Sequence, residues 1–313
     1  MQIGIIGAGS VGSATAFALM MHGVARKITL VDIDTQKAWA EAADIAHAAP
    51  FAYANKIKSG SYADLKDCSI IIITAGANQK KGETRIDLLA HNVKIFAEIV
   101  PQIVQNAPDA ILLIATNPVD IMTYVALKLS GFAQEKVIGS GTLLDTARFR
   151  TDLGYHLGVS PKSVHAHVLG EHGDSEVLCW DSGDAGSIPL TTLADDLGCP
   201  LTAEVKARID DDVRNAAYKI IAGKGATFYG IAGAVTRICQ AISTNEYAIL
   251  TVSALHDSLF GFNNVCISLP CVVGKRGIHQ VLPPQLSSRE QQLLIQSVEK
   301  MVDLCRQADK MLS

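Results

Sequence analysis

Short aliphatic runs alternate with helical patterns along roughly the first 140 residues, and this alternation restricts the folds available to the chain more than any other feature. The runs are QIGII, KITLVD, SIIIITA, AILLIAT and KVIGS. Strands joined by helical crossovers pair in parallel, and runs such as IIII and ILLI, which are apolar on both faces, belong inside a sheet that helices cover on both sides. The sequence therefore predicts a doubly wound α/β domain over residues 1–141.

The pattern changes after residue 141. Long amphipathic helices and two strands of antiparallel type, EYAILTVSAL and NNVCISLPCVVG, lead to a polar helix that starts near residue 287. This mixture predicts an α+β catalytic domain over residues 142–313. No linker, repeat or low-complexity segment separates the two halves, so we expect a tight boundary near Gly141. A chain of 313 residues is long enough for two domains, which permits a cleft between them.

The composition excludes several classes of protein. The formal net charge is -4 and no dense cluster of Lys and Arg occurs, so we expect no nucleic-acid partner. The seven cysteines are odd in number and contain no Cys-x-x-Cys, which argues against a disulfide framework and a zinc site, and we predict no metal. Gly4, Gly7, Gly9 and Gly12 would break a signal-peptide helix, and no stretch reaches the ~18 apolar residues of a membrane span. We therefore expect a cytoplasmic protein with no membrane partner.

A glycine-rich segment, IIGAGSVG, ends the first predicted strand and opens the helix after it. Gly7, Gly9 and Gly12 have the spacing G-x-G-x-x-G. Gly7 allows a tight turn, Gly9 lets the backbone approach a pyrophosphate, and Gly12 lets the helix lie close to the strand, while the helix N-terminus offers free N–H groups to the anion. The motif alone is weak evidence, because glycine-rich turns also occur in flavin and S-adenosylmethionine proteins.

Asp32 strengthens the interpretation, because it ends the next predicted strand twenty residues beyond Gly12. An acid at this place accepts hydrogen bonds from the adenosine ribose, and its charge repels a 2′-phosphate. The first domain is therefore predicted to be a Rossmann domain that binds NAD in preference to NADP. The alternative is that Asp32 only caps the next helix, a role for which Asp34 is the better candidate.

Three further stretches lie where predicted strands end: TAGANQKKGETRIDLLAHN (74–92), IATNPVDI (114–121) and GSGTLLDTARFR (139–150). Open α/β sheets bind their ligands at this edge. In the last stretch, Asp145 and Arg148 are three residues apart on a predicted helix and share one face, whereas Arg150 points to another side. Arg148 can bind a carboxylate through two N–H groups. The alternative is an ion pair on a solvated face.

His172 lies in the segment VLGEHGDSE, in a turn that follows the strand-like run SVHAHVL. A solvated surface turn is one explanation for this histidine. The other is that Asp145 accepts a hydrogen bond from the imidazole and raises its pKa, which lets His172 take and return a proton near neutral pH.

Six segments together carry a resemblance to a known family: GAGSVGSATAFAL, AGANQKKGETRIDLL, ATNPVDI, GSGTLLDTARFR, GEHGDSE and GKGATFYGIA. The chain resembles the L-lactate/malate dehydrogenase family over essentially its whole length, and within that family the bacterial type of L-lactate dehydrogenase. The resemblance implies that His172 donates and accepts the proton, Asp145 orients it, Arg148 binds the substrate carboxylate, and Arg85 polarises the carbonyl from a loop that closes over the site.

The same resemblance implies the remaining site residues. The implied substrate-binding residues are Gln79, Arg85, Asn117, Arg148 and Thr227. The implied cofactor-binding residues are Gly7, Gly9, Val11, Gly12, Asp32, Ala75, Gly76, Asn117 and Ile231. The implied reaction is reversible hydride transfer between NADH and pyruvate, which gives L-lactate. The implied enzyme is an NAD-dependent L-2-hydroxyacid oxidoreductase that acts in glycolysis and fermentation.

Gln79 bears on the substrate if the resemblance holds. A malate enzyme is expected to have an arginine here, and a neutral side chain leaves the distal carboxylate of oxaloacetate unpaired, so pyruvate fits better. Malate and longer 2-hydroxyacids such as 2-hydroxyisocaproate remain alternative substrates, and a non-catalytic NAD-sensing protein is a distant alternative.

Arg150 and His165 suggest regulation. In bacterial lactate dehydrogenases an arginine and a histidine at matching positions bind fructose 1,6-bisphosphate across a subunit interface. The resemblance therefore implies an allosteric homotetramer with this effector. The alternative is that Arg150 makes a local salt bridge and His165 lies at an interface without a ligand.

Overall fold

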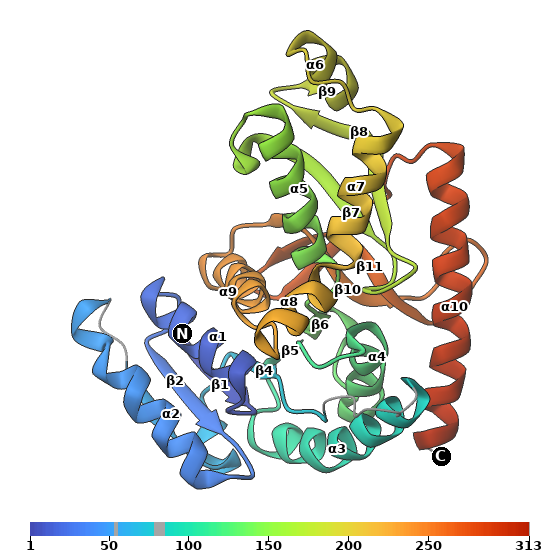
Figure 1. Ribbon diagram of the computed structural model, residues 1–313. Helices are drawn as coiled ribbons and strands as arrows, with labels where there is room; N and C mark the ends of the chain where they lie inside the picture. The colour runs from blue at the N-terminus through green and yellow to red at the C-terminus, as the bar shows by residue number, and fades with distance from the viewer. Residues whose placement is uncertain (53–55, 78–84, 313) are drawn as a thin grey trace.

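The computed structural model describes residues 1–52, 56–77 and 85–312, and for Arg85 the backbone alone (Figure 1). Its main feature is a nine-stranded sheet in the order β12-β11-β10-β6-β5-β4-β1-β2-β3. The first six strands of the chain pair in parallel, as the alternating pattern predicts. They are β1 (Gln2–Ile6), β2 (Lys27–Val31), β3 (Lys56–Ser59), β4 (Ile70–Ile73), β5 (Ile111–Ile114) and β6 (Val137–Gly139).

Helices cover both faces of this sheet, and strand β4 shows why. Ile71 and Ile73 belong to one apolar core and Ile70 and Ile72 to the other, and all four are fully buried. The first face is covered by α3 (Arg85–Asn106), α4 (Val119–Ser130) and α10 (Ser288–Leu312). The second face is covered by α1 (Ser10–Met21), α2 (Thr35–His47) and α9 (Tyr229–Thr244). The predicted fold class, a doubly wound Rossmann sheet followed by an α+β part, is confirmed.

The sheet continues past the predicted domain boundary. Strand β10 (Ala248–His256) pairs with β6 in antiparallel fashion through Ser253 and Gly139. Two more antiparallel strands follow, β11 (Val265–Gly274) and β12 (Gly277–Val281). The second half of the chain thus extends the sheet built by the first half.

A smaller sheet carries the turn that holds His172. It contains β7 (Val164–Leu169), β8 (Val177–Ala185) and β9 (Ile188–Pro189). Its apolar core includes Phe149 and Leu153 of α5 (Leu143–Leu157). The other helices here are α6 (Leu190–Asp196), α7 (Ala203–Arg214) and α8 (Ala216–Lys224). Short 3₁₀ helices occur at Ala49–Phe51, Tyr62–Leu65, Gln134–Lys136 and Pro161–Ser163.

Within the described ranges, none of the helices combines the length and the apolar character that crossing a bilayer requires.

Candidate active site

The glycine-rich segment forms a tight connection between β1 and α1. Gly7 has a φ of +106°, in the region that favours glycine, and a Cβ on Gly12 would lie 1.9 Å from the carbonyl oxygen of Gly7. A Cβ on Gly9 would meet no atom within 4 Å, so this residue borders open space. Gly9 is also the N-cap of α1 and makes no side-chain cap. The N–H groups of the first turn, which includes Val11, are therefore available to an anion.

Asp32 lies beside this loop. Its carboxylate accepts hydrogen bonds from the Ala8 N–H (2.6 Å) and the Asp34 N–H (2.9 Å). The capping of α2 falls to Asp34, whose side chain accepts from the Lys37 N–H (3.0 Å). The alternative role of Asp32 as a helix cap is therefore wrong. An uncapped helix N-terminus, open space at Gly9 and a carboxylate at the end of β2 fit the pyrophosphate and ribose of a dinucleotide.

The ends of β4 and β5 are joined by a side chain that sequence reasoning missed. Buried Asn92 of α3 accepts a hydrogen bond from the Ala77 N–H (2.7 Å) and donates one to the carbonyl of Asn117 (2.7 Å). Thr116 donates to the carbonyl of Ala75 (2.8 Å). These bonds hold Ala75, Gly76 and Asn117 at the carboxyl edge of the sheet. Asn92 is a polar residue on the apolar face of α3, in line with Leu89 and Phe96, and this position is the signal that could have identified it.

Helix α5 and strand β7 are fastened together next to His172. Thr142 donates to the carbonyl of Val168 (2.5 Å), and the Val168 N–H donates to the hydroxyl of Thr146 (2.9 Å). All three residues are buried. The first turn of α5, which carries Asp145, therefore lies against the end of β7, from which the chain enters the histidine turn.

Asp145 contacts both of the residues predicted to act with it. Its carboxylate lies 2.6 Å from Nδ1 of His172 and 2.7 Å from Nη1 of Arg148. The exposed fraction of the side chain is 2% for Asp145, 15% for Arg148 and 26% for His172. Neither alternative from the sequence holds, because the ion pair is not on a solvated face and the histidine is not in a solvated turn. Because Nδ1 is engaged, proton exchange with a ligand falls to Nε2.

The residues of this cluster stabilise one another's charged forms. Burial alone would lower the pKa of His172, but the charge of Asp145 and the hydrogen bond to it outweigh burial and raise the pKa to about 9. Burial alone would raise the pKa of Asp145, but His172 and Arg148 hold it below its usual value. Near neutral pH the histidine is therefore protonated and the aspartate is ionised.

Two more acids position the turn, and sequence reasoning assigned neither. Asp120 at the start of α4 accepts from the backbone N–H of His172 (2.8 Å), and burial raises the pKa of this carboxyl to about 6. Glu171 accepts from Lys300 of α10 (2.5 Å), and its own N–H donates to Ser297 (2.9 Å). The signal for Asp120 was its place in the IATNPVDI segment at a strand end.

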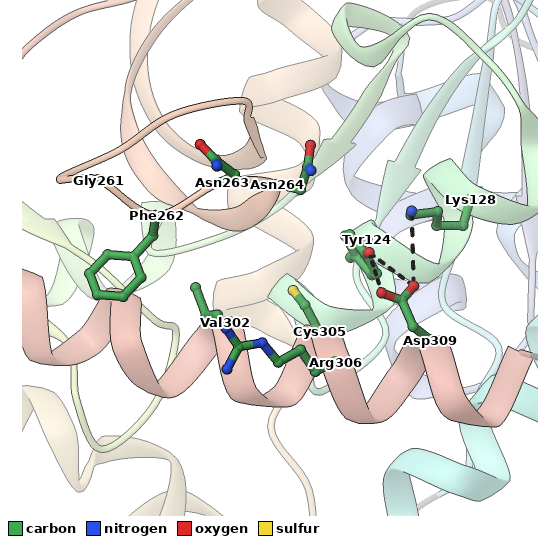
Figure 2. Close-up of a pocket in the computed structure, with 10 residues that line it drawn as sticks. All are labelled: Tyr124, Lys128, Gly261, Phe262, Asn263, Asn264, Val302, Cys305, Arg306 and Asp309. Carbon is green, nitrogen blue, oxygen red and sulfur yellow. Dashed lines mark hydrogen bonds and ion pairs between the residues drawn. The ribbon is translucent and has the colours of Figure 1, made fainter.

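Helix α10 also braces α4 farther from the turn. Figure 2 shows the Tyr124 hydroxyl of α4 directed at the Asp309 carboxylate of α10. The hydroxyl lies 2.9 Å from each carboxylate oxygen and donates to them, and Nζ of Lys128 lies 3.9 Å from the same carboxylate. A cavity of about 350 Å³ opens beside them, and none of the predicted site residues lines it. This contact supports the helix that carries Asp120.

The structure describes both residues of the predicted effector site, Arg150 of α5 and His165 of β7. Arg150 donates to the carbonyl of Lys162 (3.2 Å), which is a backbone hydrogen bond and not a salt bridge. His165 is exposed on β7. Burial, together with the nearby Arg150 and His165, lowers the pKa of His167. Arg150 of α5 and His165 and His167 of β7 therefore lie near one another.

Several predicted residues can be placed only in part. Thr227 is half-buried just before α9, and half-buried Ile231 packs against the core beneath α1. Gln79 lies outside the described residues. Arg85 is described only as the first backbone position of α3.

Comparisons with known proteins show which family the chain resembles. Residues 1–139 match the family model for the lactate/malate dehydrogenase NAD binding domain, and residues 142–310 match the model for the lactate/malate dehydrogenase alpha/beta C-terminal domain. The chain is 51% identical over 299 residues to an L-lactate dehydrogenase of Thermus aquaticus, covering 96% of each chain. It is 46% identical over 310 residues to that of Acetivibrio thermocellus, covering 98% of this chain and 97% of the relative.

Two solved structures have the same fold. A lactate dehydrogenase enzyme from a Medee basin deep-sea metagenome library superposes with a TM-score of 0.94 at 40% identity and 98% coverage of both chains. The minor L-lactate dehydrogenase of Enterococcus mundtii superposes with a TM-score of 0.93 at 37% identity and 97% coverage of both chains. On this evidence, which confirms the resemblance of the motifs, the chain belongs to the lactate/malate dehydrogenase family.

Proposed function

We propose that this chain is an NAD-dependent L-lactate dehydrogenase that interconverts pyruvate and L-lactate. The observation that carries the proposal is the buried Asp145 carboxylate, which contacts the His172 ring at 2.6 Å and the Arg148 guanidinium at 2.7 Å. This places an acid–base group beside a carboxylate-binding group, the pair that a 2-keto acid requires. Relatives named L-lactate dehydrogenase at 46–51% identity over nearly the whole chain support the choice.

Each residue of the cluster has a role in the reaction. When bound, NADH supplies the hydride that reduces the keto carbon. Nε2 of protonated His172 gives its proton to the substrate oxygen, where negative charge develops. Arg148 keeps N–H groups beyond the one on Asp145, and these bind the substrate carboxylate. Asp145 stays ionised and stabilises the imidazolium.

The remaining proposed roles are in binding the cofactor and the substrate. We assign NAD binding to Gly7, Gly9, Val11, Gly12, Asp32, Ala75, Gly76, Asn117 and Ile231. We assign substrate binding to Gln79, Arg85, Asn117, Arg148 and Thr227. Gln79 and the side chain of Arg85 lie outside what the structure describes, so their assignment depends on the sequence motif alone.

Gln79 is proposed to select pyruvate. The substitution Gln79→Arg supplies a positive charge for the distal carboxylate of oxaloacetate and should raise the ratio of kcat/KM for oxaloacetate to that for pyruvate by about 10-fold or more. Parallel assays of NADH oxidation with pyruvate, oxaloacetate and 2-ketoisocaproate measure this ratio. A natural protein that already reduces oxaloacetate, or the longer keto acid, as fast as pyruvate would contradict the assignment.

Fructose 1,6-bisphosphate is proposed as an effector of a cytoplasmic, glycolytic homotetramer. The guanidinium of Arg150, which lies close to His167 and to the exposed His165, supports this, because a guanidinium binds phosphate groups. We expect the KM for pyruvate to fall when the bisphosphate is added and Arg150→Gln to abolish that response. Light scattering gives the oligomeric state, and an unchanged KM in the natural protein would exclude the effector.

A further inference from the structure

Glu176 is a buried acid of the histidine turn to which no role has yet been given. It lies between the turn and β8 and is 4% exposed. Among the described residues, its Oε1 atom has no hydrogen-bond partner. A carboxyl oxygen buried without a partner carries a free-energy cost, and such groups call for an explanation.

Glu176 lies beside the two residues proposed to handle the proton, Asp145 and His172. One carboxylate oxygen of Glu176, one of Asp145 and a ring nitrogen of His172 all lie within 4.8 Å of one another. Arg214, at the end of α7, donates to the backbone carbonyls of Glu176 (2.7 Å) and Asp174 (3.2 Å). The chain around Glu176 is therefore held while its side chain is directed at the proton-transfer pair.

The charges around this acid decide when it ionises. They come from Asp145 and Arg148 on α5, His172 in the turn and Arg214 on α7. Asp210 and Asp174 face Arg214, and Asp120 of α4 accepts from the backbone N–H of His172. Burial and then Asp145 raise the pKa of Glu176, while His172, Arg214 and Arg148 oppose them, and the pKa rises to about 8. Glu176 is therefore mostly neutral near pH 7 and loses its proton to solvent in the alkaline range in which His172 also titrates.

We propose that Glu176 is a second acid of the proton-transfer site, which ionises in alkaline solution and then keeps His172 protonated to a higher pH than Asp145 alone would. A negative charge within 4.8 Å of the ring stabilises the imidazolium by direct attraction. The inference rests on the proposed function, since it concerns the proton that reduces pyruvate. It makes Glu176 a positioning residue for that proton and extends pyruvate reduction toward alkaline pH.

The substitution Glu176→Gln tests this, because it keeps the shape and removes the charge. In the natural protein, kcat/KM for pyruvate should fall at alkaline pH as His172 deprotonates. In the variant the midpoint of that fall should move to lower pH by about one unit. Asp181→Asn, which removes an exposed carboxylate from the same strand, is the matched control and should leave the midpoint unchanged. A midpoint that stays in place or moves to higher pH in Glu176→Gln would overturn the proposal.

A titration of the natural protein covers the case in which the variant does not fold. With ¹³C-labelled histidine rings, the NMR signal of His172 should show two inflections above neutral pH, one from Glu176 and one from the ring itself. A single inflection there would also overturn the proposal. The two failures are distinguishable, because absent pyruvate reduction at every pH would reject the proposed function, while the ring titration reports on Glu176 without any activity.

Discussion

At the scale of single residues, the buried Asp145 carboxylate determines what the candidate site can do. It is the shared partner of His172 and Arg148, so one side chain fixes the charge of the proton donor and the place of the carboxylate-binding group. Its own charge is maintained by these two cations, which outweigh the effect of burial on its pKa. Removing one partner from a buried charged group leaves the others uncompensated.

The substitution Asp145→Asn should therefore impair catalysis strongly. Without the carboxylate, burial lowers the pKa of His172 from about 9, so the proton needed for pyruvate reduction is lost at a lower pH. We expect kcat/KM for pyruvate near neutral pH to fall by about 10²–10³-fold. Rates of NADH oxidation across the pH range measure this, with Asp152→Asn on the same helix as control. An unchanged pH profile would contradict the assigned role.

The pairing of His172 with Asp145 could be predicted from sequence because both belong to recognisable segments. The contacts of Asn92, Asp120 and Glu176 could not. Asp120, for example, binds the backbone of a residue 52 positions away, and no local pattern encodes such a contact. These acids and amides were identified only once the fold had brought the segments together.

At the scale of elements, helix α10 fixes the histidine turn through two hydrogen-bonded contacts. Ser297 accepts a hydrogen bond from the Glu171 N–H (2.9 Å), and Lys300 binds the Glu171 carboxylate. In Figure 1 this helix runs along one side of the molecule, and its contacts include α4 and β8. The polar helix was predicted from its sequence, but its contact with the turn was not.

The substitution Ser297→Ala tests how much the contact between α10 and the histidine turn stabilises the protein. Ser297→Ala leaves the buried N–H of Glu171 without a partner, which should lower the free energy of unfolding by about 1–3 kcal/mol. Because the turn also carries His172, kcat should fall as well. Urea unfolding and steady-state rates measure the two effects, and Ser288→Ala, exposed at the start of the same helix, is the control. Equal stability of the two variants would show that α10 does not hold the turn.

Strand β3 shows a limit of prediction at this scale. The central strands could be predicted because IIII and ILLI are buried on both faces. Lys56–Ser59 reads KIKS and lies at the sheet edge, where only one of its residues is buried. A short polar edge strand has no aliphatic run, so sequence reasoning did not predict it.

At the scale of the whole molecule, the two halves of the chain share the nine-stranded sheet and the apolar cores on its two faces. Strand β10 pairs with β6, and Val235 and Ile238 of α9 belong to the same apolar core as Leu19 and Met20 of α1. The predicted change of fold type near residue 141 reflects a real change from parallel to antiparallel pairing. The continuity of the sheet across it depends on long-range pairing that the sequence pattern does not display.

These shared cores predict cooperative unfolding. Calorimetry should give a single thermal transition, because neither half can expose the cores without the other. NADH should move that transition to higher temperature in a concentration-dependent way, since it binds only the folded glycine loop. Two separate transitions, with NADH shifting one alone, would mean that the halves are independent domains.

The most direct test of the proposed function is the rate of NADH oxidation by the purified natural protein with pyruvate, oxaloacetate and 2-ketoisocaproate, measured beside His172→Asn. We expect the highest kcat/KM for pyruvate and a loss of about 10³-fold or more in the variant. Faster reduction of either other acid, or a variant as active as the natural protein, would contradict the proposed function.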